Sequence, residues 1–479
     1  GLADGNYVIT WSDNSGTQSG GSSYDIRAQL YNETGNAIGD EFRVNTWTGS
    51  AQYDPSVTTL SDGGFVISWR DDSGHDGGNG YDIRAQRYDG GGSALGEELL
   101  VNSYVSGYQY EPSITALDDG GFAVAWRDDN GSAGSRGGSS YDVFTKVVSV
   151  TDADGNAVDT PIVAADEVLV NSYTSGSQYD PSISSLSDGG YVVTWRDDKG
   201  SSHDGGSGVD VFGQRFDAAG EKVGDDFLVN ADADSGSQYE PSVAGLGNDK
   251  FVVTWRDDQG GSHDKNDEDS TTGSSQDVRG QIFTTRDEDG NALVTPVEAG
   301  SDFRVNTTTY QTQADPSVTS FSDGSFIVTW EANYQDGDSS YYNIYAQRFD
   351  ADGTEQGGEF RLEYRSDYKL WHFNPFATAA VTSNGMTFIG GGIFLDVFLG
   401  RRIVITPSFA PTLYQGGTSD LDLGHVLEFR SQLEIAYRFD DRSRLGLSLS
   451  HYSNASLSDS NPGTESFLLN YSLPFSKIF

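Results

Sequence analysis

The sequence contains no cysteine, one methionine (Met386) and few basic residues. Without cysteine, the chain has neither disulfides nor a thiolate metal site. Its 29 Lys and Arg stand against 72 Asp and Glu, which gives a net charge of −43 and a pI of about 4.1. Nucleic-acid phosphates would repel such a chain, so no nucleic-acid partner is expected. Because residue 1 is a glycine, we expect a processed product or a fragment.

Long apolar runs are also missing from the chain. No stretch reaches the roughly 18 apolar residues of a transmembrane helix, although the strands of a transmembrane barrel alternate and escape this criterion. Glycine, by contrast, is abundant, at 60 of 479 residues, and Asn, Asp and Ser accompany it. Hydrophobic residues make up 35% and aromatic residues 12%, enough for a folded core. The composition therefore predicts an all-β protein of two or three domains with many turns.

A repeated unit fills the first three-quarters of the sequence. Segments such as "GGFVISW" and "GGYVVTW" recur and end at six tryptophans, Trp11, Trp69, Trp126, Trp195, Trp255 and Trp330. Each repeat adds strand-like runs of the types "YDIRAQRY", "EFRVN" and "DPSV", except that the first lacks "DPSV". Four short strands joined by Gly/Asp turns are typical of a β-propeller blade. We therefore expect residues 1–358 to form a propeller of about six blades, the first incomplete; a row of β-sandwiches is the alternative.

The loops that follow the repeat tryptophans are rich in carboxylates. In "WRDDSGHDGGNGYD", Asp71, Asp72, Asp76 and Asp82 offer the hard oxygen ligands that Ca²⁺ prefers. The spacing is not that of an EF-hand, and Gly/Asp turns need the same residues for backbone reasons. Both interpretations, a Ca²⁺ site and a set of turns, stay open.

These repeats resemble the Gly/Asp-rich "DGGFVVTW" repeats of large secreted bacterial surface proteins. The resemblance covers residues 1–358 and is compatible with a glycan or another cell-surface ligand for the propeller.

From about residue 359 the pattern changes to longer, strictly alternating strands. In "EFRLEYRSDYK" and "HVLEFRSQLEIAYRF", one face is apolar and the other is charged or polar along the whole strand. A small outer-membrane barrel requires this arrangement, because lipid surrounds it and polar side chains fill it. We expect residues 359–479 to form such an antiparallel barrel, with strands at 359–369, 374–382, 386–398, 402–414, 425–439, 444–454 and 464–475.

Seven strands are one fewer than an even-numbered barrel needs. The strand-like run at 342–350 precedes the first of them and is the expected eighth strand. Eight strands would place the propeller in the periplasm, and seven would place it outside the cell. The sequence leaves both locations open.

The last predicted hairpin carries polar side chains on its lipid-facing side. Leu449, His451 and Ser453 share one face of their strand, and Glu465 and Phe467 share the apolar face of the next. Pairing Leu449 with Phe467 places His451 opposite Glu465, with Cβ atoms about 4.5–5.5 Å apart. Ser453, His451 and Glu465 can therefore form a hydrogen-bonded chain, and because polar groups that face lipid are costly, three of them together need an explanation. One explanation is a Ser-His-Glu catalytic site. The alternative is a polar girdle at the membrane interface.

The stretches "HYSNA" (451–455) and "NPGTE" (461–465) resemble the PagL-like lipid A 3-O-deacylases, which are eight-stranded outer-membrane barrels. The resemblance covers about residues 359–479 and implies an esterase of the Gram-negative outer membrane. It implies that lipopolysaccharide is the partner, and hydrolysis by such a site requires no cofactor.

The same resemblance implies a role for each matching residue. His451 would be the general base, Ser453 the nucleophile and Glu465 the acidic partner, while Asn461 would contact the oxyanion. To these we add the backbone N–H of Gly463 as a second oxyanion donor, and Asn454 as a supporting residue. The alternative function is a calcium-dependent adhesion or carbohydrate-binding propeller that an inert barrel anchors.

Overall fold

The computed structural model divides into two compact units, Gly1–Thr354 and Glu355–Phe479, close to the expected boundary after residue 358. None of the described residues forms a helix, so none of them belongs to a helix that could cross a membrane. The structure describes residues 1–2, 5–15, 24–74, 80–105, 107–129, 141–152, 156–198, 208–231, 236–258, 276–287, 289–306, 312–333, 342–383, 385–416, 423, 425–455 and 464–474.

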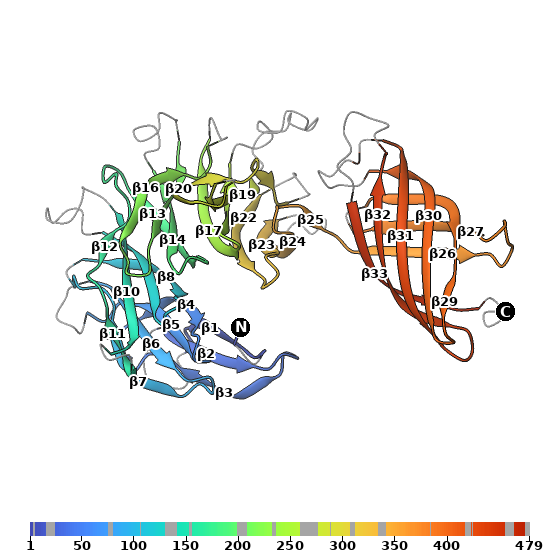
Figure 1. The fold of residues 1–479 in the computed structure, drawn as a ribbon. Helices are drawn as coiled ribbons and strands as arrows, with labels where there is room; N and C mark the ends of the chain where they lie inside the picture. Colours follow the sequence, from blue (N-terminus) through green and yellow to red (C-terminus); the bar gives the residue numbers. More distant parts are fainter. Residues whose placement is uncertain are drawn as a thin grey trace. The chain divides into compact units, whose positions relative to one another are not determined.

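The first unit consists of six successive antiparallel sheets, which confirms the propeller-like repeat (Figure 1). The first blade has three strands because it lacks the "DPSV" run, namely β1 (Tyr7–Asp13), β2 (Asp25–Tyr31) and β3 (Ala37–Arg43). The second blade contains β4 (Gln52–Thr59), β5 (Phe65–Asp71), β6 (Asp82–Tyr88) and β7 (Ala94–Leu100). The third contains β8 (Gln109–Ala116), β9 (Phe122–Asp128), β10 (Asp142–Thr151), β11 (Ala157–Val163) and β12 (Val168–Leu169).

The remaining blades follow the same order. The fourth contains β13 (Gln178–Ser185), β14 (Tyr191–Asp197), β15 (Asp210–Phe216) and β16 (Lys222–Leu228). The fifth contains β17 (Gln238–Gly247), β18 (Lys250–Asp257), β19 (Asp277–Arg286), β20 (Ala292–Glu298) and β21 (Phe303–Arg304). The sixth contains β22 (Gln313–Ser320), β23 (Phe326–Asn333), β24 (Tyr342–Phe349) and β25 (Glu355–Gln356).

The run at 342–350, expected as an eighth barrel strand, lies in the propeller instead. It forms β24, which pairs antiparallel with β23 along its whole length. The rings of Phe326 and Phe349 stack there at 5.2 Å, as Phe65 and Tyr88 do at 5.1 Å in the second blade. The packing pattern of the repeat therefore holds this strand in the sixth blade.

Apolar clusters join each blade to the next. We call the face of a blade that packs on its successor the trailing face, and the face that packs on its predecessor the leading face. Between the second and third blades, Ile83 and Ala85 of the trailing face share a buried cluster with Val124 and Trp126 of the leading face. Burying these side chains on both sides stabilises the contact and fixes the order of the blades.

A buried asparagine repeats beside these clusters. Asn102 accepts the N–H of Ile83 at 2.7 Å through Oδ1 and donates to Asp82 Oδ1 at 2.8 Å through Nδ2. The "VN" dipeptide of the first five repeats thus closes a polar network that the apolar clusters surround. The same two bonds are made by Asn45, Asn171, Asn230 and Asn306.

Asn102→Ala should destabilise the chain by about 1–3 kcal/mol, because the buried N–H of Ile83 loses its acceptor. Urea unfolding followed by tryptophan fluorescence measures this loss. Asn36→Ala is the matched control, since Asn36 lies in an exposed turn, and it should change stability by less than about 0.5 kcal/mol. Equal effects of the two substitutions would contradict a structural role for the buried network.

The second unit is one antiparallel sheet that curls into a nearly closed barrel in the order β26-β27-β28-β30-β31-β32-β33. Among the described residues, β26 pairs only with β27 and β33 only with β32. The short β29 pairs with β30. The strands are β26 (Glu359–Arg365), β27 (Asn374–Thr382), β28 (Thr387–Phe394), β29 (Val397–Leu399), β30 (Ile403–Gln415), β31 (Leu427–Arg438), β32 (Arg444–Ser453) and β33 (Thr464–Ser472).

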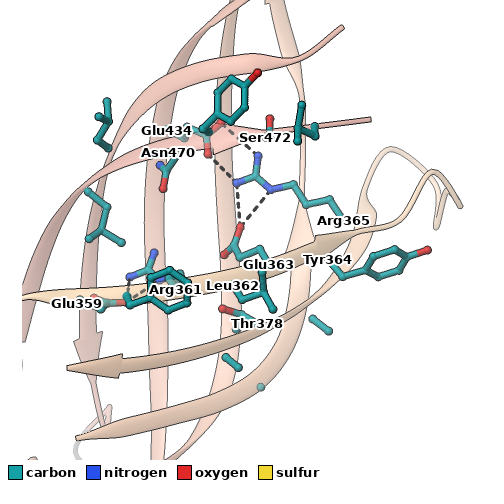
Figure 2. Close-up of a pocket in the computed structure, with 18 of the residues that line it drawn as sticks. Glu359, Arg361, Leu362, Glu363, Tyr364, Arg365, Thr378, Glu434, Asn470 and Ser472 are labelled. Atoms are coloured by element: carbon teal, nitrogen blue, oxygen red, sulfur yellow. Dashed lines mark hydrogen bonds and ion pairs between the residues drawn. The ribbon is translucent and has the colours of Figure 1, made fainter. Parts of the chain in front are cut away.

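Charged side chains fill the middle of the barrel, as the alternation predicted. Arg365 Nη2 lies 2.9 Å from Glu363 and 2.7 Å from Glu434 (Figure 2). Arg430 Nη2 lies 2.5 Å from Glu363. A cavity of about 940 Å³ extends between β26 and β33, the two unpaired edges of the sheet. Arg361 reaches Ser466 of β33 at 3.0 Å, so side chains rather than backbone bonds link these edges.

Candidate active site

Strict alternation on β32 determines which side chains face outward. Leu447 and Leu449 are exposed, whereas Ser448 and Ser450 are buried in the interior. His451 continues the outer row because it lies two residues beyond Leu449. The strand therefore delivers an imidazole to the apolar outer surface of the barrel, as the sequence predicted.

The predicted register between the last two strands is the one observed. Leu449 pairs with Phe467, and His451 pairs with Glu465. His451 Nδ1 lies 2.8 Å from Glu465 Oε1, with side-chain exposures of 52% and 68%. A carboxylate on Nδ1 favours the tautomer that leaves Nε2 available as a base.

Ser453 lies two residues after His451 on the same face, at the end of β32. Its Oγ accepts the backbone N–H of Ala455 at 3.1 Å, and Ala455 has a φ of 54° at the start of the following turn. Among the described residues, no hydrogen bond joins Ser453 to His451. Residues two apart on a strand are separated by about 6.5–7 Å, a span that a serine and a histidine side chain on one face can bridge.

A second serine, which was not predicted from the sequence, borders the histidine. Ser431 of β31 pairs directly with His451, on the side opposite Glu465, and its side chain is exposed. The sequence contains the feature that predicts this pairing. A tight hairpin pairs Arg438 with Arg444, and this fixes the register between β31 and β32. Three adjacent strands thus place Ser431, His451 and Glu465 in one row.

Asn454, expected to support the site, turns to the other side of the strand. Its side chain is fully buried, and Nδ2 donates to the carbonyl oxygen of Leu423 at 2.9 Å. Leu423 belongs to an apolar cluster that also holds Phe388 and Tyr452. The sequence predicted a polar interior. At the end of the barrel where His451 lies on the outer face, the interior instead contains this cluster of apolar side chains.

Two expected oxyanion donors, Asn461 and Gly463, lie outside the described residues, as does Asp76 of the carboxylate loop. The other three carboxylates of that loop contact cations or amides of the propeller. Asp71 accepts from Arg84 Nε at 2.8 Å, Asp72 from Arg70 Nε at 3.1 Å, and Asp82 from Asn102.

Burial raises the pKa of Asp72, and the neighbouring Arg70 opposes this shift. Over the part of the chain that the structure describes, no group of three or more His, Cys, Asp or Glu side chains is arranged to hold a metal ion.

Residues 325–474 match the family model described as lipid A 3-O-deacylase (PagL). The match spans less than a third of the chain, and it includes all strands of the barrel together with β23 and β24. The C-terminal region is therefore similar to this family. No curated protein matches the chain.

Several solved structures share a low overall likeness with the chain. A protein of unknown function from Dyadobacter fermentans DSM 18053 is 11% identical, with a TM-score of 0.42 and coverage of 72% of this chain and 91% of its own. An α-L-arabinanase from Penicillium chrysogenum is 13% identical, with a TM-score of 0.36 and coverage of 68% and 87%. A sialidase from Trypanosoma rangeli is 11% identical, with a TM-score of 0.33 and coverage of 96% and 93%. Such scores carry no argument about function.

Proposed function

We propose that the C-terminal barrel is an outer-membrane esterase that removes an acyl chain from lipid A through Ser453, His451 and Glu465. The observation that carries the proposal is the 2.8 Å contact between His451 Nδ1 and Glu465 Oε1 on the apolar outer face. A membrane-facing imidazole with a carboxylate partner is placed to act on a substrate that is itself part of the membrane. Similarity of the region to lipid A 3-O-deacylases supports this choice of substrate.

The chemistry follows the roles of a nucleophile and its base. His451 Nε2 accepts the hydroxyl proton of Ser453 while Oγ bonds to the ester carbonyl carbon. The bond to the sugar oxygen then breaks, and the imidazolium returns the proton to that oxygen as the alcohol leaves. Water, deprotonated by the same imidazole, next attacks the acyl-serine. The bond from the acyl carbon to Oγ breaks, the imidazolium returns the proton to Oγ, and a fatty acid leaves. Glu465 holds the imidazole in position and stabilises its charged form.

The developing oxyanion needs donors near Ser453. We assign this role to the Asn461 side chain and the Gly463 backbone N–H, on the basis of sequence position. Such a donor contributes roughly 2.7–4 kcal/mol to transition-state stabilisation in a serine protease.

Lipid A from cells that express the chain should lack one hydroxyacyl group in mass spectra, whereas cells that express Ser453→Ala should keep it. Both proteins must be present in the outer-membrane fraction in equal amounts. Fully acylated lipid A in both strains would refute the esterase and favour the adhesion propeller, with its glycan or other surface ligand. Loss of the acyl group in both strains would instead refute Ser453 as the nucleophile.

A further inference from the structure

The chain enters the barrel at the end where His451 lies, which we call the His451 end. β26 begins at Glu359, and the hydroxyl of Tyr452, the residue after His451, donates to Glu359 Oε1 at 3.4 Å. Just before this strand, the Gly358 N–H donates to Ser383 Oγ at 2.9 Å, and the Ser383 N–H donates to the Gly358 carbonyl oxygen at 2.7 Å. Since Ser383 directly follows β27, these two bonds hold the entry point of the chain beside the end of that strand.

The register of the whole sheet agrees with this placement. The strands β26, β27, β28, β30, β31, β32 and β33 run alternately away from the His451 end and towards it. The pairs that mark this end across the sheet are Glu359 with Thr382, Val381 with Thr387, Thr387 with Gln415, Leu413 with Leu427, Phe429 with Ser453, and Tyr452 with Thr464. β26 therefore runs away from the His451 end, and the residues that precede it leave the barrel there.

The outer surface of the barrel indicates where the membrane lies. Near the opposite end, the exposed rings of Tyr437 and Tyr471 flank Leu445, because both residues pair with it. From Leu445 to His451 the strand rises by about 20 Å, and the outward residues between them are leucines. Outer-membrane barrels carry an apolar band about 25 Å tall between two interfaces, with aromatic girdles at its borders. The His451 row therefore lies near one border of this band and the tyrosine row near the other.

The connection between the propeller and the barrel is very short. Only Gly357 and Gly358 separate β25, the last strand of the sixth blade, from β26. A fully extended chain covers about 11 Å in the three steps from Gln356 to Glu359. This reach is less than half of the apolar band of about 25 Å. The connection is therefore too short to carry the sixth blade across the membrane from the side at which β26 begins.

We propose that the propeller lies on the same side of the membrane as the His451 row and that this side is the outer surface of the cell. The shared side follows from the path of the chain and from the short connection. The outer location rests on the proposed function, because lipid A occupies the outer leaflet of a Gram-negative outer membrane. With β24 in the sixth blade, seven described strands form the barrel, which is the arrangement that the sequence associated with an external propeller. A ligand of the propeller then reaches it from outside the cell.

Because the chain contains no cysteine, single cysteines can report the side of the membrane on which a residue lies. Val294→Cys marks the propeller at an exposed position of β20, Gln415→Cys marks the His451 end, and Asp440→Cys marks the opposite end of the barrel. Each full-length variant is expressed in Gram-negative cells whose lipopolysaccharide lacks long saccharide chains. Intact and permeabilised cells are treated with a maleimide-polyethylene glycol that is too large to cross the outer membrane.

Val294→Cys and Gln415→Cys should be labelled to the same extent in intact and permeabilised cells. Asp440→Cys should be labelled several-fold more after permeabilisation, because it faces the periplasm. This pattern would support the proposal.

Other labelling patterns separate a failure of this proposal from a failure of the esterase. Label on Gln415→Cys but not on Val294→Cys in intact cells would overturn the shared side and leave the active site at the outer leaflet. Label on Asp440→Cys alone would overturn the outer location and would also remove His451 from lipid A. Equal labelling or equal protection of all three sites would overturn the proposal, because the two barrel ends would not be separated by the membrane. The expected labelling with unchanged lipid A would refute the esterase alone and would still place the propeller outside the cell.

Discussion

Ser453→Ala and His451→Ala should each slow acyl release from lipid A by a similar factor, on the order of 10⁴–10⁶, because nucleophile and base act as one unit. Glu465→Gln should cost about ten- to a hundredfold less, since Glu465 only orients and stabilises the imidazole. The exposure of the His451–Glu465 pair, 52% and 68%, supports a partial effect, because the imidazole can reorient when the carboxylate is lost. Initial rates of fatty acid release by the purified full chain measure all three factors.

Ser431→Ala is the matched control for this series. Ser431 pairs with His451 across β31 and β32 and shares its outer face, so both serines border the same imidazole. We expect Ser431→Ala to keep most of the activity. A large loss with Ser431→Ala, together with activity in Ser453→Ala, would transfer the nucleophile to Ser431 and leave the base and the carboxylate in their roles.

Much of this site could be predicted because successive side chains of a strand alternate between its two faces. With Leu449 and Phe467 facing lipid, a shift of one residue would turn the polar rows outward. Pairing these two residues directly then places His451 against Glu465, as observed. Ser431 required one more step, the register of the hairpin at Arg438 and Arg444. That step is also local, so the serine could have been found from the sequence.

Other features depend on contacts between distant segments, which alternation does not encode. The run at 342–350 has the pattern of a strand in either unit, and the stacking of Phe349 on Phe326 accompanies its place in the sixth blade. Asp71 has the local sequence of a calcium ligand, and its contact with Arg84 on the next strand cannot be read from that local sequence. Alternation turns Asn454 away from the Ser453 face, but its contact with Leu423 inside the barrel joins segments 31 residues apart and is not encoded by that pattern.

Arg430→Met should destabilise the barrel by about 3–5 kcal/mol, because it leaves the Glu363 carboxylate, 14% exposed, without one of its two cations. The Arg430 side chain is fully buried, and its Nη2 lies 2.5 Å from Glu363 Oε1. The second cation, Arg365, is shared with Glu434 and cannot compensate fully. The loss is measured by electrophoresis of unheated samples after incubation in urea. A folded barrel migrates faster than the unfolded chain, and the urea concentration at which this faster band disappears reports the stability.

The surface pair of Arg402 and Asp440 is the matched control in the same barrel. Its members are 43% and 90% exposed at a separation of 2.8 Å, and Arg402→Met should cost no more than about 1 kcal/mol. The double variant Arg430→Met/Glu363→Gln should recover stability relative to Arg430→Met alone, since it removes the unpaired charge while Arg365 keeps Glu434. The second substitution removes only the unpaired charge. If the double variant were less stable than Arg430→Met alone, the loss of stability would therefore come from the missing packing of the long arginine side chain and not from the charge.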